Sequence, residues 1–181
     1  MLFDDWKSST IILNNGSEFN NTMVKYNVLR NKFLFHRNDS TFEFLDDVAE
    51  IRMKDDNLND IVFKKITNAE IKAQEGSYVQ VLSEGKVMLY KHYTRTIEGE
   101  NYTNGIFTSE KKIIPHNSIW AIVNNKTLSV KTNASFLEEL TSDKIDDVKK
   151  YIKEKRLNIK SEKDFAAAIS FYNLINSSPK N

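Results

Sequence analysis

The chain contains no cysteine among its 181 residues. Disulfides, zinc–thiolate sites, cysteine-bound iron–sulfur clusters and thiol nucleophiles are therefore excluded. This absence does not identify a compartment, because many exported proteins also lack disulfides.

Glycine and proline are scarce, with 5 and 2 residues respectively. The five glycines do not have the spacing of a phosphate loop, a dinucleotide-binding fingerprint or a nucleophile elbow. Asparagine is abundant instead and occurs in pairs at Asn14-Asn15, Asn20-Asn21 and Asn124-Asn125. Because its short polar side chain tolerates left-handed backbone angles, we expect the chain to turn on asparagine and aspartate.

The chain has no excess of charge of one sign and no long apolar run. Its 26 basic and 25 acidic residues give a net charge of +1, so no nucleic-acid partner is expected. No run of 18 apolar residues occurs, which predicts no membrane span. The first residues, Met1 to Trp6, do not have the pattern of a signal peptide. Such a start is typical of a cytoplasmic protein or of an exported protein whose signal has been removed.

Apolar and polar residues alternate from about residue 9 to residue 131. Val24, Tyr26 and Val28 fall on one face, for example, with a lysine and an asparagine between them. Such alternation indicates strands with one wet face, and the short turns between them favour antiparallel pairing. We predict an α+β fold in which residues 9–131 form an antiparallel β-meander of roughly nine to eleven strands, as a rolled sheet or partly open barrel.

The pattern changes to helical spacing after Lys131. We predict two to three C-terminal α-helices within residues 133–176, packed on the meander, so that residues 1–181 form a single domain. The apolar positions and capping residues that indicate these helices are Phe136, Leu137, Leu140; Ile145, Val148, Ile152; and Ser161, Asp164, Phe165, Ile169 and Tyr172.

The three histidines, His36, His92 and His116, lack the spacing of metal ligands on one element. We expect His36 and His92 to point outward from strands. No catalytic residue, metal site or cofactor is predicted. An enzyme would need a site assembled in space, around His92 or His116.

One loop, residues 55–60, is rich in oxygen ligands and resembles the opening of a calcium loop. The match fails because the sixth position is Asp60 rather than glycine and the twelfth is Ile66 rather than glutamate. We interpret the segment as a solvated hairpin loop, with weak calcium binding as the alternative.

One segment combines basic and aromatic residues in a way that suits partner binding. The alternative is an ordinary strand with Leu89 inward and long cations covering its wet face. The tentative partner-binding residues are Tyr90, Lys91, His92, Tyr93 and Arg95.

Several segments together resemble a known group. They are Asp5-Trp6-Lys7, Ile11 to Gly16, Val24 to Val28, Val81 to Leu89, Tyr151 to Leu157 and Phe171-Tyr172-Asn173. In this order they are similar to small uncharacterised exported β-rich proteins of Bacteroidetes bacteria. The resemblance implies an exported, periplasmic or extracellular protein, with a cytoplasmic one as the alternative, and it supplies no site residues.

These observations favour a non-enzymatic binding or structural module of the bacterial cell envelope. Its strand edges or a sheet face would recognise a protein or glycan partner. The alternative is a carrier of a small apolar ligand inside the rolled sheet, unless the inward rings fill the interior themselves. The rings in question are Tyr26, Phe33, Phe35, Phe42 and Phe44.

Overall fold

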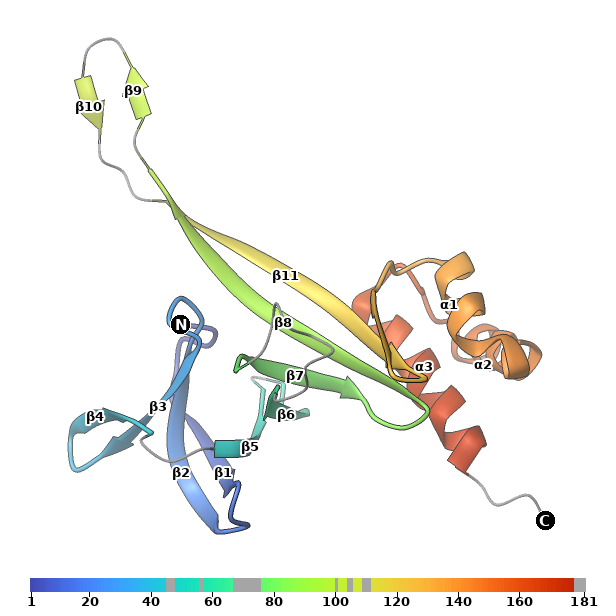
Figure 1. The fold of residues 1–181 in the computed structure, drawn as a ribbon, viewed down its shortest axis with the longest axis horizontal. Coiled ribbons are helices and arrows are strands. Elements are labelled where there is room, and N and C mark those ends of the chain that lie inside the picture. Colours follow the sequence, from blue (N-terminus) through green and yellow to red (C-terminus); the bar gives the residue numbers. More distant parts are fainter. Residues whose placement is uncertain are drawn as a thin grey trace. The chain divides into compact units, whose positions relative to one another are not determined.

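The computed structural model describes residues 1–44, 48–55, 57–66, 76–99, 101–103, 106–108 and 112–177 (Figure 1). The strands are β1 (Lys7–Leu13), β2 (Glu18–Asn27), β3 (Lys32–Arg37), β4 (Ser40–Glu43), β5 (Val48–Lys54), β6 (Asp60–Lys65), β7 (Tyr78–Ser83), β8 (Val87–Glu98), β9 (Asn101–Thr103), β10 (Ile106–Thr108), β11 (Lys112–Val123) and β12 (Lys126–Ser129). The helices are α1 (Ala134–Thr141), the short 3-10 helix η2 (Ser142–Lys144), α2 (Ile145–Lys155) and α3 (Glu162–Ser177).

Ten of these strands form one open antiparallel sheet in the order β12-β11-β8-β7-β6-β5-β1-β2-β3-β4. The remaining two, β9 and β10, pair with each other. The helices follow the last strand, so the predicted α+β class, with an antiparallel sheet and a helical C-terminal segment, is confirmed.

Apart from the β9–β10 hairpin, which is inserted between β8 and β11, the strand order departs from a simple meander at one place. β1 to β4 are neighbours in chain order, but β5 pairs with β1 rather than with β4. Ile11 lies opposite Ile51 in this pair, and both side chains are fully buried. β1 is therefore an interior strand, and β4 lies at one end of the sheet.

Asparagine makes the tight turns that the sequence predicts. Gly16, after Asn14-Asn15, has φ +83° and donates its backbone N–H to Leu13 between β1 and β2. Asn124 and Asn125 have φ angles of +49° and +59° between β11 and β12. The left-handed Asn124-Asn125 pair matches the twist of the two strands that it joins.

The chain forms two compact units. The first contains residues 1–65, 76–78 and 92–117, and the second contains residues 66–75, 79–91 and 118–181. The long strands β8 and β11 contribute one portion to each unit.

The core of the first unit is an aromatic cluster. The rings of Tyr26 and Phe33 stack with centroids 4.5 Å apart, and Phe33 meets Phe63 and Tyr78 edge-on at 5.3 and 5.0 Å. The Tyr26 hydroxyl donates to Asn31 Oδ1 at 2.6 Å. Burial raises the pKa of Tyr26, so this phenol stays neutral. These rings fill the interior of the unit themselves.

The core of the second unit joins the three helices to β8 and β11. Val87, Leu89 and Ala121 meet residues of α1, α2 and α3 there. The helical contributors are Leu137, Leu140, Val148, Phe165, Ala168, Ile169 and Tyr172. In the described ranges, no helix has the length and apolarity that crossing a membrane requires.

A buried amide ties α3 to the turn between β7 and β8. Asn173 accepts the Val87 N–H at 2.9 Å, and its Nδ2 donates toward Ser83 Oγ, Glu84 O and Val87 O at 2.9, 3.1 and 2.7 Å. A Cβ at Gly85 would lie 2.7 Å from the Asn173 side chain. The absence of a side chain at Gly85 therefore allows the helix to approach the turn.

We predict that Asn173→Ala destabilises the chain by about 3 kcal/mol, because it leaves buried backbone groups of the turn without their partner. The measurement is urea unfolding followed by the helical far-UV circular dichroism signal. Leu174→Ala on the same helix is the matched control: this side chain is 63% exposed, so its removal should change stability little. Equal effects of the two substitutions would contradict the role given to the amide.

Candidate functional site

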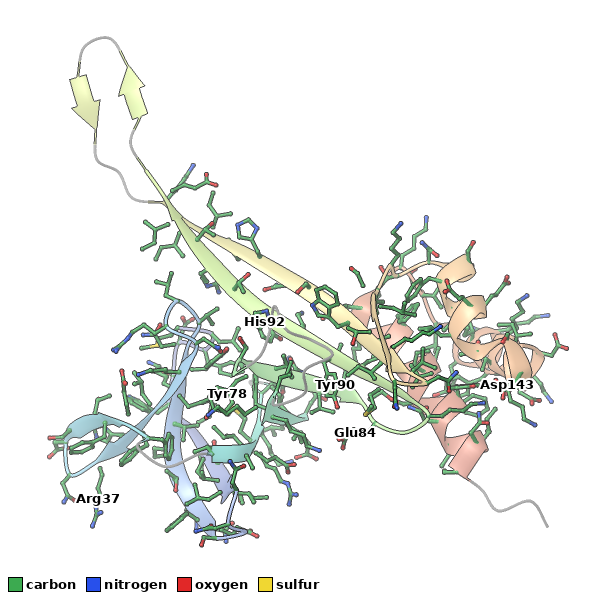
Figure 2. The ribbon with its side chains drawn as sticks, viewed as in Figure 1. Arg37, Tyr78, Glu84, Tyr90, His92 and Asp143 are labelled. Carbon is green, nitrogen blue, oxygen red and sulfur yellow. The ribbon has the colours of Figure 1, made fainter. Side chains whose placement is uncertain are left out.

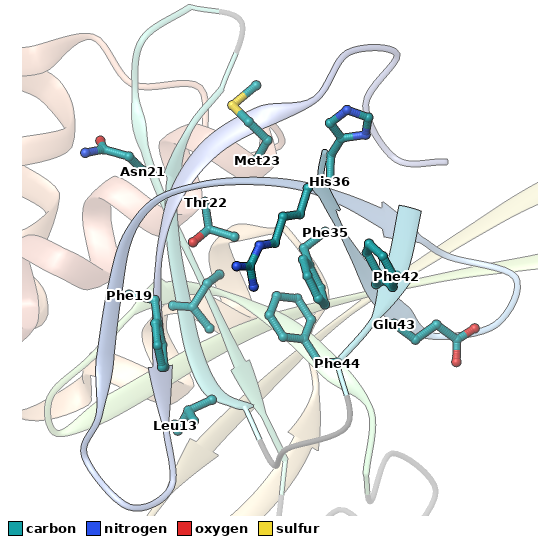
Figure 3. A pocket seen from close by; sticks show the side chains of 12 residues that line it. Leu13, Phe19, Asn21, Thr22, Met23, Phe35, His36, Phe42, Glu43 and Phe44 are labelled. Atoms are coloured by element: carbon teal, nitrogen blue, oxygen red, sulfur yellow. The ribbon is translucent and has the colours of Figure 1, made fainter. Parts of the chain in front are cut away.

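A hollow of about 570 Å³ lies on strands β1 to β4 of the first unit. Figure 3 shows Leu13 and Phe19 on one side of it and Phe35, Phe42 and Phe44 on the other. Its apolar lining residues are Ile11, Leu13, Phe19, Met23, Phe35, Phe42 and Phe44, and its polar ones are Asn21, Thr22, His36, Arg37 and Glu43.

A β-bulge in β2 places Phe19 in the hollow. Ser9 lies opposite Thr22, but two residues further along β1, Ile11 lies opposite Phe19, so β2 contains one extra residue there. Asn21 takes the left-handed angle φ +55° within this bulge. Without the extra residue, Phe19 would alternate to the other face of the sheet.

The opposite wall consists of three phenylalanines on β3 and just after β4. Phe35 lies directly opposite Phe42, and their rings stack at 5.4 Å. Phe44 contacts Phe35 with ring centroids 4.8 Å apart. This packing holds the rings in place, yet Phe42 is still 46% exposed, as Phe19 is 53% exposed across the hollow. The hollow is therefore open to solvent.

The charged groups at the hollow divide into a paired anion and an unpaired cation. Glu43 binds Arg30 and Lys32, each at 2.6 Å. The hydrogen bond from Lys32, helped by the charges of Arg30 and Lys32, holds the pKa of Glu43 below its ordinary value, although desolvation acts in the opposite direction. Within the described part of the chain, the Arg37 guanidinium has neither a hydrogen bond nor an ion pair.

This arrangement is suited to binding. Exposed rings on a rigid support offer apolar area, and a free guanidinium offers a site for an anion. Over the residues that the structure describes, histidine and carboxylate side chains do not gather in groups of three that could hold a metal ion.

The predicted partner-binding residues on β8 do not share one face, because successive side chains alternate. Tyr90 packs at the small core of Ile66, Val79 and Ile122, on the same face as His92. Lys91 points the other way and forms an ion pair with Glu162 of α3. Figure 2 shows Tyr90 and His92 on this strand.

His92, Tyr93 and Arg95 belong to the first unit. The expectation that His92 points outward is wrong, since the residue is only 6% exposed. Tyr93 packs against the aromatic core, with its ring 6.3 Å from Phe63, and Arg95 is half-buried. Partner binding by Tyr90, Lys91, His92, Tyr93 and Arg95 stays a prediction.

The other two histidines, His116 and His36, have separate environments. His116 is exposed, and its Nε2 lies 2.9 Å from Thr96 Oγ1. His36 is half-buried, with its ring 5.3 Å from Trp6. Its Nδ1 is buried and lacks a hydrogen-bond partner among the described residues.

The acidic loop is the β5–β6 hairpin loop, as interpreted from the sequence. The Asp55 carboxylate accepts the backbone N–H groups of Asn57 and Asn59, each at 2.8 Å. Asn59 Nδ2 donates to the same carboxylate. These bonds give Asp55 a turn-forming role; Asp56 lies outside the described residues, and calcium binding stays untested.

Sequence reasoning named Phe35, Phe42 and Phe44 as inward rings but missed Phe19 and Arg37. The signal for Phe19 was present in the Asn20-Asn21 pair, because asparagine at a left-handed position is typical of a bulge. Arg37 follows Phe35 by two residues, so alternation assigns both to one face.

Comparison with known proteins yields no relative: no family model matches the chain, and neither does any curated protein or solved structure.

We predict that Asn21→Val destabilises the chain by about 1–2 kcal/mol, because a β-branched residue is strained at a left-handed angle. Asn21→Gly, which tolerates that angle, is the control and should keep near-normal stability. Thermal unfolding by circular dichroism measures both. Wild-type stability in the valine variant would show that the bulge is not held by Asn21.

We predict a pH dependence that originates at His92. Burial holds its pKa below the ordinary 6.5, so the unfolded chain binds a proton that the folded chain resists. This contribution is complete above pH 6.5 and is lost as the pH falls below 6.5 toward the folded pKa.

The test is urea unfolding of the wild type and of His92→Gln on both sides of that window. The wild type should lose more stability on acidification than His92→Gln does. His116→Gln, which removes an exposed histidine, is the control substitution. An unchanged response in His92→Gln would contradict the assignment.

Proposed function

We propose that the chain is a non-enzymatic binding module of the bacterial cell envelope that recognises a partner protein through the hollow on β1 to β4. The observation that carries the proposal is the exposure of two large rings, Phe19 and Phe42, at 53% and 46%. Both stand over a floor of packed apolar side chains rather than at isolated surface positions. The sequence resemblance supports the envelope as the setting.

The chemistry of the hollow favours a protein over a glycan. A sugar is held by several side-chain donors and acceptors around a ring, but Glu43 is already engaged by Arg30 and Lys32. Most of the remaining lining is phenylalanine, leucine, isoleucine and methionine. Apolar side chains of a partner fit this surface better, since their burial removes both surfaces from water.

The volume of the hollow also suits a small apolar ligand, the alternative function. About 570 Å³ lies within the roughly 300–1,000 Å³ of small-molecule sites. A carrier, however, covers most of its ligand. The rings that could enclose a ligand here do not surround one space. Tyr26 and Phe33 are buried against each other, whereas Phe42 faces solvent. The open side is better covered by the surface of a protein.

The geometry gives less support to an enzyme built around a histidine. His92 is buried, and His116 bonds to Thr96 on the surface. Neither lines the hollow.

The proposal predicts that Phe19→Ser with Phe42→Ser abolishes partner binding while the fold persists. Each lost ring removes about 1.5–3 kcal/mol of apolar burial, which corresponds to at least about tenfold in affinity. The test is selection from a displayed random-peptide library on the immobilised wild-type chain. Peptides rich in apolar residues should be enriched, and their affinity for the double variant should fall by at least that factor.

Leu58→Ser is the matched control, because Leu58 is 75% exposed and lies in the β5–β6 loop, outside the hollow. It removes an exposed apolar side chain without touching the lining. Circular dichroism confirms that each variant is folded. Peptides that bind the double variant as tightly as the wild type, or a library that yields no binders, would overturn the proposal.

A further inference from the structure

Among the residues that the structure describes, strand β4 has one open edge. In the sheet formed by the described residues it is the terminal strand and pairs with β3. The β3–β4 turn contains two residues, Asn38 and Asp39, with φ +49° and +57°, and Arg37 lies opposite Ser40. The residues that flank such a turn form a hydrogen-bonded pair, so Ser40 and Phe42 direct their backbone groups toward β3.

The backbone groups of the alternate residues point away from β3. Alternation assigns the N–H and C=O groups of Thr41 and Glu43 to the open edge. An extended segment that paired there would satisfy these groups as another strand does. Its residues opposite Ser40 and Phe42 would form the close, non-hydrogen-bonded pairs, in which side chains approach most nearly.

Those two positions lie on the face of the hollow. Phe42 stacks on Phe35 there, and Ser40 lies opposite Arg37. A side chain opposite Phe42 therefore meets the exposed ring, and one opposite Ser40 lies two strand spacings, roughly 10 Å, from the Arg37 backbone. Because Ser40 is small, the long Arg37 side chain can reach across it.

We infer that β4 accepts an extended antiparallel segment of a partner protein in which an apolar residue precedes an acidic residue by two positions. The apolar side chain packs on Phe42 in the hollow, and the carboxylate pairs with Arg37. This inference rests on the proposed function and names the partner segment that the hollow binds. Charge complementarity carries it: within the described residues Arg37 is unpaired, whereas Glu43 is neutralised by Arg30 and Lys32.

Antiparallel addition sets the order of the two side chains. β4 runs from Ser40 to Glu43, so a segment in the opposite direction passes Phe42 before Ser40. Antiparallel pairing is the arrangement found for the strand pairs of this sheet. The reversed order, acidic before apolar, fits a parallel segment and should bind more weakly.

The probe is the capped peptide acetyl-Thr-Val-Thr-Phe-Thr-Glu-Thr-amide, titrated into the full chain labelled with nitrogen-15. The expected result is slower amide hydrogen exchange at Thr41 and Glu43, together with resonance shifts at Phe19 and Phe42. Replacing the threonine between phenylalanine and glutamate by proline removes the N–H that pairs with the edge, so this peptide should lose the protection.

The carboxylate is tested by a double-mutant cycle between protein and peptide. A second peptide carries glutamine in place of the glutamate. Arg37→Gln should weaken binding of the glutamate peptide about two- to fivefold, as for an exposed ion pair, and should leave binding of the glutamine peptide unchanged. An equal loss for both peptides would overturn the pairing with Arg37.

Failure of this inference is distinguishable from failure of the proposed function. Shifts at Phe19 and Phe42 without protection of Thr41 and Glu43 overturn strand addition and leave the hollow as a binding site. Absence of binding by this peptide also overturns the inference, whereas the proposed function stands or falls with the library selection, which presupposes no peptide sequence.

Discussion

The hollow depends on one backbone constraint, the left-handed residue within β2. Side chains on a strand alternate between the two faces of the sheet. Counting back from Val24 to the start of β2 therefore assigns each residue to one face. The extra residue at Asn20-Asn21 interrupts that count and turns Phe19 to the side of Ile11. The apolar surface opposite Phe42 therefore exists because one asparagine accepts an angle that most residues avoid.

The same type of side chain has two roles within this unit. Tyr26 and Phe33 pack against Phe63 and Tyr78 and fill the interior of the unit. The rings nearer the end of the sheet pack on one side, while the other side of Phe42 remains in water. A rigid aromatic support beneath exposed rings loses little conformational freedom on association, which is a favourable property for recognition.

Local patterns in the sequence were sufficient for the fold class and the turns. Alternation identified the strands, helical spacing identified the C-terminal elements, and the Asn14-Asn15 and Asn124-Asn125 pairs marked two hairpins, whereas Asn20-Asn21 lies in the bulge of β2. The return of β5 to β1 could not be predicted, because it depends on which apolar faces meet in space. The burial of His92 was missed for a related reason: its neighbours in sequence do not reveal what the rest of the fold places over it.

The candidate site was predictable only in part. Phe35, Phe42 and Phe44 were recognised as inward rings, but counting alone assigns Phe19 to the wrong face unless the bulge is anticipated. Grouping Tyr90 with Lys91 by adjacency overlooked the alternation that separates them. The residue types indicate which interactions Tyr90 and Lys91 can make. The alternation of the strand determines which face each side chain lies on.

The tie between Asn173 and the β7–β8 turn has a consequence for the order of events during synthesis. The two partners, Asn173 and Val87, are separated by 86 positions along the chain. When β8 leaves the ribosome, the helices that cover Val87 and Leu89 have not yet been made. The second unit therefore closes its core last, and the nascent chain carries an uncovered apolar strand until α3 emerges, which is the interval when a chaperone is of most use.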